Sequence, residues 1–267
     1  MPPVAVVGNL SRDHVDGGPP RLGGGPYHAA RGLRVLGRPA RIVARCGNGD
    51  RRAFLRRLTS LGVPVHAVRG GSTAAFSIRY EGDERIMSID ELGDTWTPRD
   101  VGRDALGDAV WVHVAPLARS DFPAETLARL AQGRRISLDG QGLVRVPRVG
   151  PLELDAEYDP EVLRYLAVLK LAEEEARVLL GETTPAALAS LRVPEVLVTR
   201  GKVGSTLWAG GRLVDVPARP IEDVDPTGAG DAFAAGYLVG RSEGLAPAAA
   251  ARRATALVAS LLSVRAR

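Results

Sequence analysis

The residues best suited to chemistry stand together near the C-terminal end of the chain. From Asp225 to Asp231 the sequence reads Asp-Pro-Thr-Gly-Ala-Gly-Asp, and an apolar, helix-forming run follows at once. Glycines just ahead of a helix leave backbone N–H groups unpaired, and the helix dipole adds partial positive charge at the same place. We expect an anion hole made by Gly228, Ala229 and Gly230. Such a hole suits a phosphoryl group in transfer, whose charge lies on its equatorial oxygens.

Asp231 would stand at the start of that helix. The helix dipole favours its ionised form, so the carboxylate could orient an alcohol and accept its proton. The alternative is an ordinary loop in which Asp231 only caps the helix. The β-like segment 219–224 before the string and the apolar helix after it favour the chemical interpretation.

Two glycine-containing segments lie near the N-terminus. The first expected strand is followed by Gly8-Asn9-Leu10-Ser11-Arg12-Asp13, and three glycines come later at Gly23, Gly24 and Gly25. Glycine lets a ligand press against the backbone because no Cβ stands in the way. The alternative for the stretch 17–25 is a flexible linker.

Acidic and basic residues follow two later apolar runs. Glu173, Glu174 and Glu175 follow the run 166–171 after Ala172. By themselves they are acidic residues in a first helical turn, where the helix dipole favours negative charge. In the segment 137–145, Arg145 carries a guanidinium that suits an oxyanion. A loop salt bridge between Asp139 and Arg145 is an equal alternative.

Together these motifs resemble those of the ribokinase-like (PfkB) carbohydrate kinases, and the resemblance covers nearly the whole chain. That family phosphorylates sugars, nucleosides, inositols and related alcohols. The resemblance implies ATP and Mg²⁺ as cofactors, with Asp231 as the catalytic base beside the anion hole of Gly228 to Gly230. The run Gly23–Gly25 is similar to the family's N-terminal di-glycine signature. The implied substrate-binding residues are Asp13, Gly23, Gly24, Gly25, His28 and Arg145.

The same resemblance implies a nucleotide site. The segment from Val198 to Gly204 is similar to the family's nucleotide-binding strand and turn, and the last two helices would complete the adenine pocket. Glu175 matches the glutamate that organises Mg²⁺ through water, and Asp225 belongs to a loop that often holds a monovalent cation such as K⁺. The implied nucleotide-binding residues are Lys170, Glu175, Thr199, Arg200, Gly201, Gly204, Thr227, Ala254 and Thr255.

Two positions depart from the family pattern. Ala172 stands where an asparagine is expected, so half of the Asn-x-x-Glu motif is missing. His28 stands where ribokinases carry a substrate asparagine, and it could bond a polyol or sit satisfied in its helix. The strings Gly-Gly-Pro-Tyr from Gly24 and Leu-Asp-x-Gln-Gly from Leu138 look most like the branch that contains inositol kinases.

The rest of the chain alternates short apolar runs with longer helical patterns. This alternation predicts an α/β fold with a parallel sheet covered on both faces. The expected strands are Pro3–Val7, Arg41–Ala44, Ala109–Val114, Arg135–Leu138, Leu166–Leu171 and Val196–Thr199. The expected helices are Tyr27–Leu36, Asp50–Leu61, Asp121–Gln132, Glu173–Leu180, Gly228–Val239 and Pro247–Ser263.

One segment interrupts this alternation. Two short runs, Ala74–Tyr80 and Glu84–Ile89, meet at Gly82-Asp83, which predicts a hairpin. A hairpin between βα units does not easily join the central sheet, so we expect it to protrude as a lid. The resemblance implies a three-layer α/β/α fold with a mainly parallel central sheet. We expect a single domain over residues 1–267, with a small β lid formed by about 9–22 and 70–96.

Composition limits the class of protein. The 267 residues are 45% hydrophobic, enough for a substantial core, yet no apolar run reaches the ~20 residues that cross a bilayer. Residues 1–8 lack a signal-peptide pattern, and the single cysteine, Cys46, agrees with a reducing cytoplasm. The net charge is only +4, aromatics are 4%, and the arginines are scattered beside acids, which argues against nucleic-acid binding.

The leading hypothesis is ATP-dependent phosphorylation of a hydroxyl on a sugar, inositol or related polyol, in the cytoplasm and without a nucleic-acid or membrane partner. A nucleoside kinase of the same fold is the first alternative. The second is a non-catalytic sugar- or nucleotide-binding regulator, which Ala172 and His28 motivate. A lid edge could pair across a homodimer, although nothing in the sequence demands it.

Overall fold

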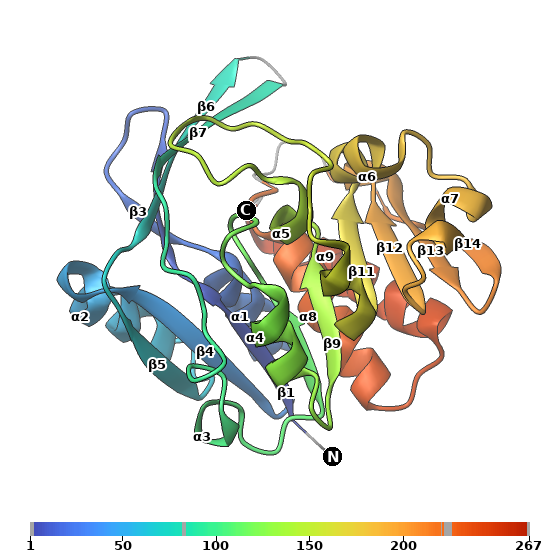
Figure 1. The fold of residues 1–267 in the computed structure, drawn as a ribbon, viewed down its shortest axis with the longest axis horizontal. Helices are drawn as coiled ribbons and strands as arrows, with labels where there is room; N and C mark the ends of the chain where they lie inside the picture. The colour runs from blue at the N-terminus through green and yellow to red at the C-terminus, as the bar shows by residue number, and fades with distance from the viewer. Residues whose placement is uncertain (1–2, 82–83, 220, 222–225, 266–267) are drawn as a thin grey trace.

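The computed structural model describes residues 3–81, 84–219, 221 and 226–265 (Figure 1). One large sheet lies between two sets of helices, and a second, smaller sheet stands apart from it. The predicted α/β class with a mainly parallel central sheet is confirmed. Within the described residues, no helix combines the length and the apolar character needed to cross a membrane.

The large sheet has the strand order β14-β13-β12-β11-β9-β8-β1-β4-β5. Neighbouring strands from β12 to β5 run parallel, while β13 and β14 add an antiparallel extension at one edge. The strands are β1 (Val4–Asn9), β4 (Ala40–Gly47), β5 (Val65–Gly70), β8 (Trp111–Val114), β9 (Arg135–Asp139), β11 (Leu166–Ala172), β12 (Glu195–Thr199), β13 (Gly204–Ala209) and β14 (Arg212–Pro217).

Strand residues alternate between two apolar clusters because successive side chains point to opposite faces of a sheet. In β1, Val4 and Val6 belong to one cluster, and Ala5 and Val7 belong to the other. Helices cover both clusters, so neither face needs polar residues. This is why the central strands read as near-continuous apolar runs in the sequence.

The helices form a layer on each face of the large sheet. On one face lie α1 (Gly25–Leu36), α8 (Ala229–Ser242) and α9 (Pro247–Arg265). The other cluster draws on α3 (Arg103–Leu106), α4 (Ala124–Leu130), α5 (Gln141–Val144), α6 (Glu173–Leu180) and α7 (Pro185–Ser190). α2 (Asn48–Thr59) packs against β4 and β5. Two short 3₁₀ helices, η1 (Pro160–Tyr165) and η2 (Gly201–Val203), complete the described elements.

The small sheet has the order β10-β7-β6-β2-β3 and holds the predicted hairpin. Its strands are β2 (Ser11–Val15), β3 (Arg21–Gly23), β6 (Ala74–Glu81), β7 (Glu84–Glu91) and β10 (Gly150–Pro151). β6 and β7 pair antiparallel, as the sequence predicts. Because β2 follows β1 after one residue, the small sheet stands beyond the C-terminal end of β1 (Figure 1).

A segment from the middle of the chain joins the small sheet to the core. We call residues 145–155 the strap. Within it, β10 pairs with β7 along the edge of the small sheet. At its two ends, Arg145 forms a β-bridge with Leu154, and Asp155 forms an ion pair with Arg119 at 2.6 Å. The strap therefore connects the edge of the small sheet to the short helix α5.

Two stretches differ from their predicted structure. The helix expected to start at Asp121 starts at Ala124, because the Asp121 carboxylate turns inwards and accepts the Leu117 N–H at 2.9 Å. The glycine-rich stretch 17–25, for which a flexible linker was the alternative, contains a turn at Gly17 (φ 69°) and the strand β3. A hydrogen bond within the loop fixes the first stretch, and a turn with the pairing of β3 to β2 fixes the second.

Asn9, at the end of β1, ties three segments together in the core. Its amide nitrogen donates to Asp121 Oδ2 and to the carbonyl of Asp94, each at 3.0 Å, and its oxygen accepts the Trp96 indole N–H at 3.0 Å. Burial raises the pKa of Asp121 to about 6, although the hydrogen bonds from Leu117 and Asn9 oppose that rise. This network fixes the point at which the chain leaves β1 for the small sheet.

Replacing Asn9 with alanine should lower the free energy of unfolding by roughly 2–3 kcal/mol, because it leaves the Trp96 N–H and the Asp121 carboxylate buried without this partner. Urea unfolding measures the change. Asn48→Ala is the matched control, since Asn48 is the chain's other asparagine and is exposed at the start of α2. It should change stability by less than about 0.5 kcal/mol. Equal effects of the two substitutions would contradict the role given to Asn9.

Candidate active site

Polar side chains gather at the C-terminal ends of the central strands, on the face that α8 covers. Trp111 and Val168 belong to the apolar cluster of that face. Residues two apart on a strand share a face, so His113 and Lys170 lie on the same side, nearer the strand ends. Lys170 stands opposite Asp139 in the register of β11 and β9. The sheet therefore brings these two charged side chains together above the apolar layer.

A buried ion pair forms the centre of this group. Lys170 Nζ lies 3.1 Å from Asp139 Oδ2, and the two side chains are 5% and 2% exposed. Burial alone would lower the pKa of Lys170, but Asp139, Glu175 and Asp231 raise it, so the ammonium persists. Burial would likewise raise the pKa of Asp139, and the charge of Lys170 lowers it below its ordinary value. One cation thus stands among three carboxylates.

The start of α8 presents backbone N–H groups beside this ion pair. Gly228 caps the helix at φ 78°, a conformation that favours glycine. Ala229 donates its N–H to the carbonyl of Pro226 at 2.9 Å, so that group is engaged in the turn. Gly230 lies beside the ion pair, because a methyl group there would stand 3.1 Å from Lys170 Nζ. Of the expected anion hole, the Ala229 N–H is therefore engaged in the turn, while Gly230 lies next to Lys170.

Asp231 lies in the first turn of α8, half-buried and facing the ion pair. Burial and the negative charge of Asp139 raise the pKa of Asp231 to about 7. The positive charges of Lys170 and Arg145 oppose that rise. The two neighbouring aspartates therefore differ in how readily they bind a proton. Asp139 is held ionised by Lys170, while Asp231 can take up a proton near neutral pH.

Two glycines let the N-terminal segment approach the carboxylates. A methyl group at Gly25 would stand 2.7 Å from Asp231 Oδ1, and one at Gly23 would stand 2.5 Å from the carboxyl carbon of Asp13. Ser11 donates its hydroxyl to Asp13 Oδ1 at 2.7 Å. The absence of side chains at positions 23 and 25 is what allows the start of α1 and strand β3 to close against the site.

Asp13 and Asp231 line one cavity of about 650 Å³, which we call the larger cavity. The other expected substrate residues that line it are Gly24, Gly25, His28 and Arg145. Gly23 lies behind Asp13 and does not line it. The wall on the side of the small sheet and the strap is mainly apolar, and includes Phe76, Ile78, Met87, Leu117, Leu152 and Leu154. The larger cavity therefore has one polar and one apolar wall.

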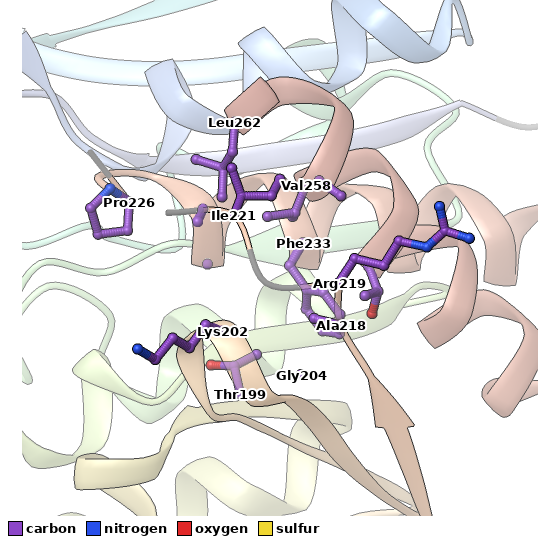
Figure 2. A pocket seen from close by; sticks show the side chains of 15 residues that line it. Thr199, Lys202, Gly204, Ala218, Arg219, Ile221, Pro226, Phe233, Val258 and Leu262 are labelled. Carbon is purple, nitrogen blue, oxygen red and sulfur yellow. The ribbon is translucent and has the colours of Figure 1, made fainter. Parts of the chain in front are cut away.

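A second cavity of about 370 Å³, the smaller cavity, opens beside the first (Figure 2). Thr199, Pro226 and Gly230 line both cavities, so the two compartments meet at the start of α8. Figure 2 shows Phe233 and Val258 among the apolar side chains that project into the smaller cavity. Apolar walls next to a helix start suit a ligand that joins a flat nucleobase to phosphates.

The expected nucleotide-binding residues divide between the two cavities. The smaller cavity is lined by Thr199, Gly201, Gly204 and Thr255. The larger cavity is lined by Lys170, Glu175, Thr199 and Thr227. The structure therefore gathers these seven positions around one junction. It places Lys170 and Glu175 near Asp231, and not in the smaller cavity where a nucleobase would fit.

Two expected nucleotide-binding residues line neither cavity. Arg200 forms an ion pair with Asp215 of β14 at 2.8 Å and is directed away. Ala254 is fully buried, where it packs against Gly236 of α8. Asp225, expected at a monovalent cation, lies outside the described residues.

Some lining residues were not predicted from the sequence. On α9, Val258, Ala259 and Leu262 line the smaller cavity with Thr255, at spacings of three, four and seven residues. That helical spacing is a signal which, starting from Thr255, could have found them. His113 lines neither cavity, but it lies beside Asp139 and Asp231 and was also not predicted. Its signal was a polar residue in the middle of an otherwise apolar strand.

Glu175 fits the requirements of a water-held Mg²⁺. Its Oε2 accepts the N–H of Ala172 at 2.7 Å, which commits one of its two oxygens. Ala172 itself offers no side-chain ligand, but Glu174 lines the same wall of the larger cavity. Mg²⁺ keeps several waters and usually takes one or two carboxylates together with substrate phosphates. The residues present therefore fit a water-held Mg²⁺, although Ala172 replaces the expected asparagine.

Comparisons with known proteins show which chains this one is similar to. The family described as "pfkB family carbohydrate kinase" matches this chain over residues 15–265. The sequence is 30% identical to a fructokinase of Klebsiella pneumoniae, over 88% of this chain and 83% of that protein. It is 35% identical to an inositol 3-kinase of Zea mays, over 48% of this chain and 32% of that protein.

A solved structure shares the fold over almost the full length. It is a pyrophosphate-dependent kinase in the ribokinase family, complexed with a pyrophosphate analog and myo-inositol. The TM-score is 0.85 at 24% sequence identity, over 97% of this chain and 95% of that one. The likeness confirms the ribokinase-like arrangement of the two sheets.

Any reaction in which Asp231 must accept a proton should slow as the pH falls. With its pKa at about 7, the carboxylate is half protonated near that pH, and the protonated form cannot act as a base. An ordinary aspartate would lose activity only near about pH 4. The pH dependence of kcat/KM should therefore show an acidic limb with an apparent pKa of about 7.

Lys170→Met should move that limb to higher pH, because it removes a positive charge that lowers the pKa of Asp231. Lys202→Met, at the chain's other lysine, should leave the position of the limb unchanged. A limb near about pH 4 in the unmodified protein, or equal shifts in the two variants, would contradict these electrostatics.

Proposed function

Because this chain belongs to the pfkB family of carbohydrate kinases, we propose that it transfers the γ-phosphoryl group of ATP to a hydroxyl of a sugar, an inositol or a related polyol. The observation that carries the proposal is the place of Asp231. It lines the larger cavity next to Gly230, at the junction with the smaller cavity. A base at this position can face an acceptor on one side and a phosphoryl donor on the other.

The acceptor would lie in the larger cavity. Asp13 and the backbone at Gly24 and Gly25 would bind its hydroxyls, and the reacting hydroxyl would face Asp231. Asp231 would take the proton of that hydroxyl as the new O–P bond forms. Its pKa of about 7 suits this role, because a base works best when its pKa lies near the working pH.

The donor would span both cavities. Adenine and ribose would occupy the smaller cavity, and the phosphates would reach the junction at Gly230. There the N–H groups of Gly228 and Gly230 would stabilise the charge on the transferring group. Arg145, which lines the larger cavity, carries a guanidinium suited to phosphate oxygens. Mg²⁺, held by Glu175 through water, would neutralise further phosphate charge.

The walls of the larger cavity favour a hydroxyl-rich ring as the acceptor. One wall offers a carboxylate, backbone groups and an arginine, while the other offers Phe76, Ile78 and Met87. A polyol ring can present hydroxyls to the first wall and its C–H face to the second. The similarity to a fructokinase and to an inositol 3-kinase supports this class of acceptor. A nucleoside is the second candidate, because the apolar wall could also cover a base.

Kinase assays with Mg²⁺ and ATP over inositols, pentoses, hexoses and nucleosides test this proposal. We expect turnover on one class, and Asp231→Asn should reduce kcat by roughly 10²- to 10⁴-fold while the acceptor still binds. Asp104→Asn, at an exposed aspartate of α3, should keep normal turnover.

Turnover that survives in Asp231→Asn would reject this residue as the base. If the unmodified protein binds ATP and polyols but transfers nothing to any class, the non-catalytic regulator becomes the better account.

The smaller cavity makes ATP the expected donor rather than pyrophosphate, because pyrophosphate has no base to fill an apolar compartment. Val258→Trp should fill that compartment and raise the KM for ATP by about tenfold or more, with little change in the KM for the acceptor. The measurement is initial rate against each substrate in turn. Faster turnover with pyrophosphate than with ATP, or an unchanged KM for ATP in the variant, would show that the smaller cavity does not hold the donor.

A further inference from the structure

His113 is a fully buried polar residue directly beneath the candidate base. It lies on β8, where its side chain is 0% exposed. In the register of β8 and β9 it stands opposite Ser137, and its Nδ1 lies 3.1 Å from Ser137 Oγ. Ser137 precedes Asp139 by two residues, so all three side chains project from the same face of the sheet.

The second ring nitrogen of His113 has no evident partner. Nε2 is buried without a hydrogen bond in the described part of the chain. A ring nitrogen of His113, one oxygen of Asp139 and one oxygen of Asp231 all lie within 4.8 Å of one another. A buried polar atom without a partner costs free energy. Both carboxylates are suitable acceptors for a proton on that nitrogen.

The surroundings decide which nitrogen carries the proton. Burial and the charge of Lys170 lower the pKa of His113 to about 4, although Asp139 opposes this, so the ring is neutral and has one N–H. The Ser137 hydroxyl can either donate or accept, whereas an ionised carboxylate can only accept. The arrangement that satisfies both neighbours has Ser137 donating to Nδ1 and the proton on Nε2.

A metal ion is the competing explanation for this group, because a histidine and two aspartates are suitable ligands. However, Lys170 Nζ already lies 3.1 Å from Asp139 Oδ2. A divalent ion would place a second cation beside that ammonium in a buried site. The positive charge at this point is therefore supplied by the chain itself, and His113 is left as a neutral donor.

We propose that His113 is a positioning residue that directs its Nε2–H at the Asp139–Asp231 pair and so holds Asp231 towards the larger cavity. Lys170 restrains Asp139 from the other side, and the neutral donor reduces the repulsion between the two carboxylates without adding charge. The proposal rests on the proposed function, because it gives His113 a part in aiming the base of that reaction. His113 itself touches neither substrate.

Three substitutions separate this role from simple packing. His113→Gln places an amide N–H near the position of Nε2, His113→Asn places one near the position of Nδ1, and His113→Leu supplies neither. We expect His113→Leu and His113→Asn to lower kcat by roughly 10- to 100-fold with KM for both substrates changed less than about threefold. His113→Gln should recover most of kcat. His66→Leu, on the edge strand β5 and outside both cavities, should keep normal kcat.

Normal kcat in His113→Leu, or equal loss in the glutamine and asparagine variants, would overturn the proposal. If the variants do not fold, nitrogen-15 NMR of the unmodified protein, labelled at its four histidines, decides instead. The His113 signals should show a neutral ring protonated at Nε2, and protonation at Nδ1 would exclude the proposed bond. The NMR result does not require turnover, so failure of the proposed function and failure of this inference can be told apart.

Discussion

The site depends on one buried ammonium group. Lys170 lies within the ends of the parallel strands, paired with Asp139 and close to Asp231 and Glu175. At an effective dielectric of about 20, two unit charges about 4 Å apart interact by roughly 4 kcal/mol. Without a cation, three neighbouring carboxylates could not all stay ionised. The ammonium affects the two aspartates to different degrees. It holds Asp139 ionised, while the pKa of Asp231 stays raised at about 7.

The fold provides this arrangement through sheet geometry and close backbone approach. In an open parallel sheet, ligand sites form beyond the carboxyl ends of the strands, and here Asp139 and Lys170 end two neighbouring strands. α8 then starts directly above them and contributes Asp231. The missing side chain at Gly25 allows α1 to reach the same carboxylate. The ends of β9 and β11 and the starts of α8 and α1 therefore all lie next to the Asp231 carboxylate.

The sequence predicted what is local and missed what depends on packing. The string ending at Asp231 and the apolar strands were readable because their signals lie in consecutive residues. Arg200 and Lys202 are two residues apart on one turn, and the 3₁₀ turn at η2 decides that Lys202 faces the smaller cavity. Thr255 and Ala254 are likewise adjacent, and the packing of Ala254 on Gly236 decides which of them lines the cavity. No pattern of consecutive residues shows which of two such neighbours faces the cavity.

The strap gives the small sheet a mechanical link to the electrostatics of the base. Its strand β10 pairs with β7, which carries Met87 of the apolar wall, and the strap begins at Arg145, whose charge lowers the pKa of Asp231. A movement of the small sheet onto an acceptor would therefore also pull on the chain that carries Arg145. The place of the small sheet and the protonation of Asp231 are thus linked through a single stretch of chain.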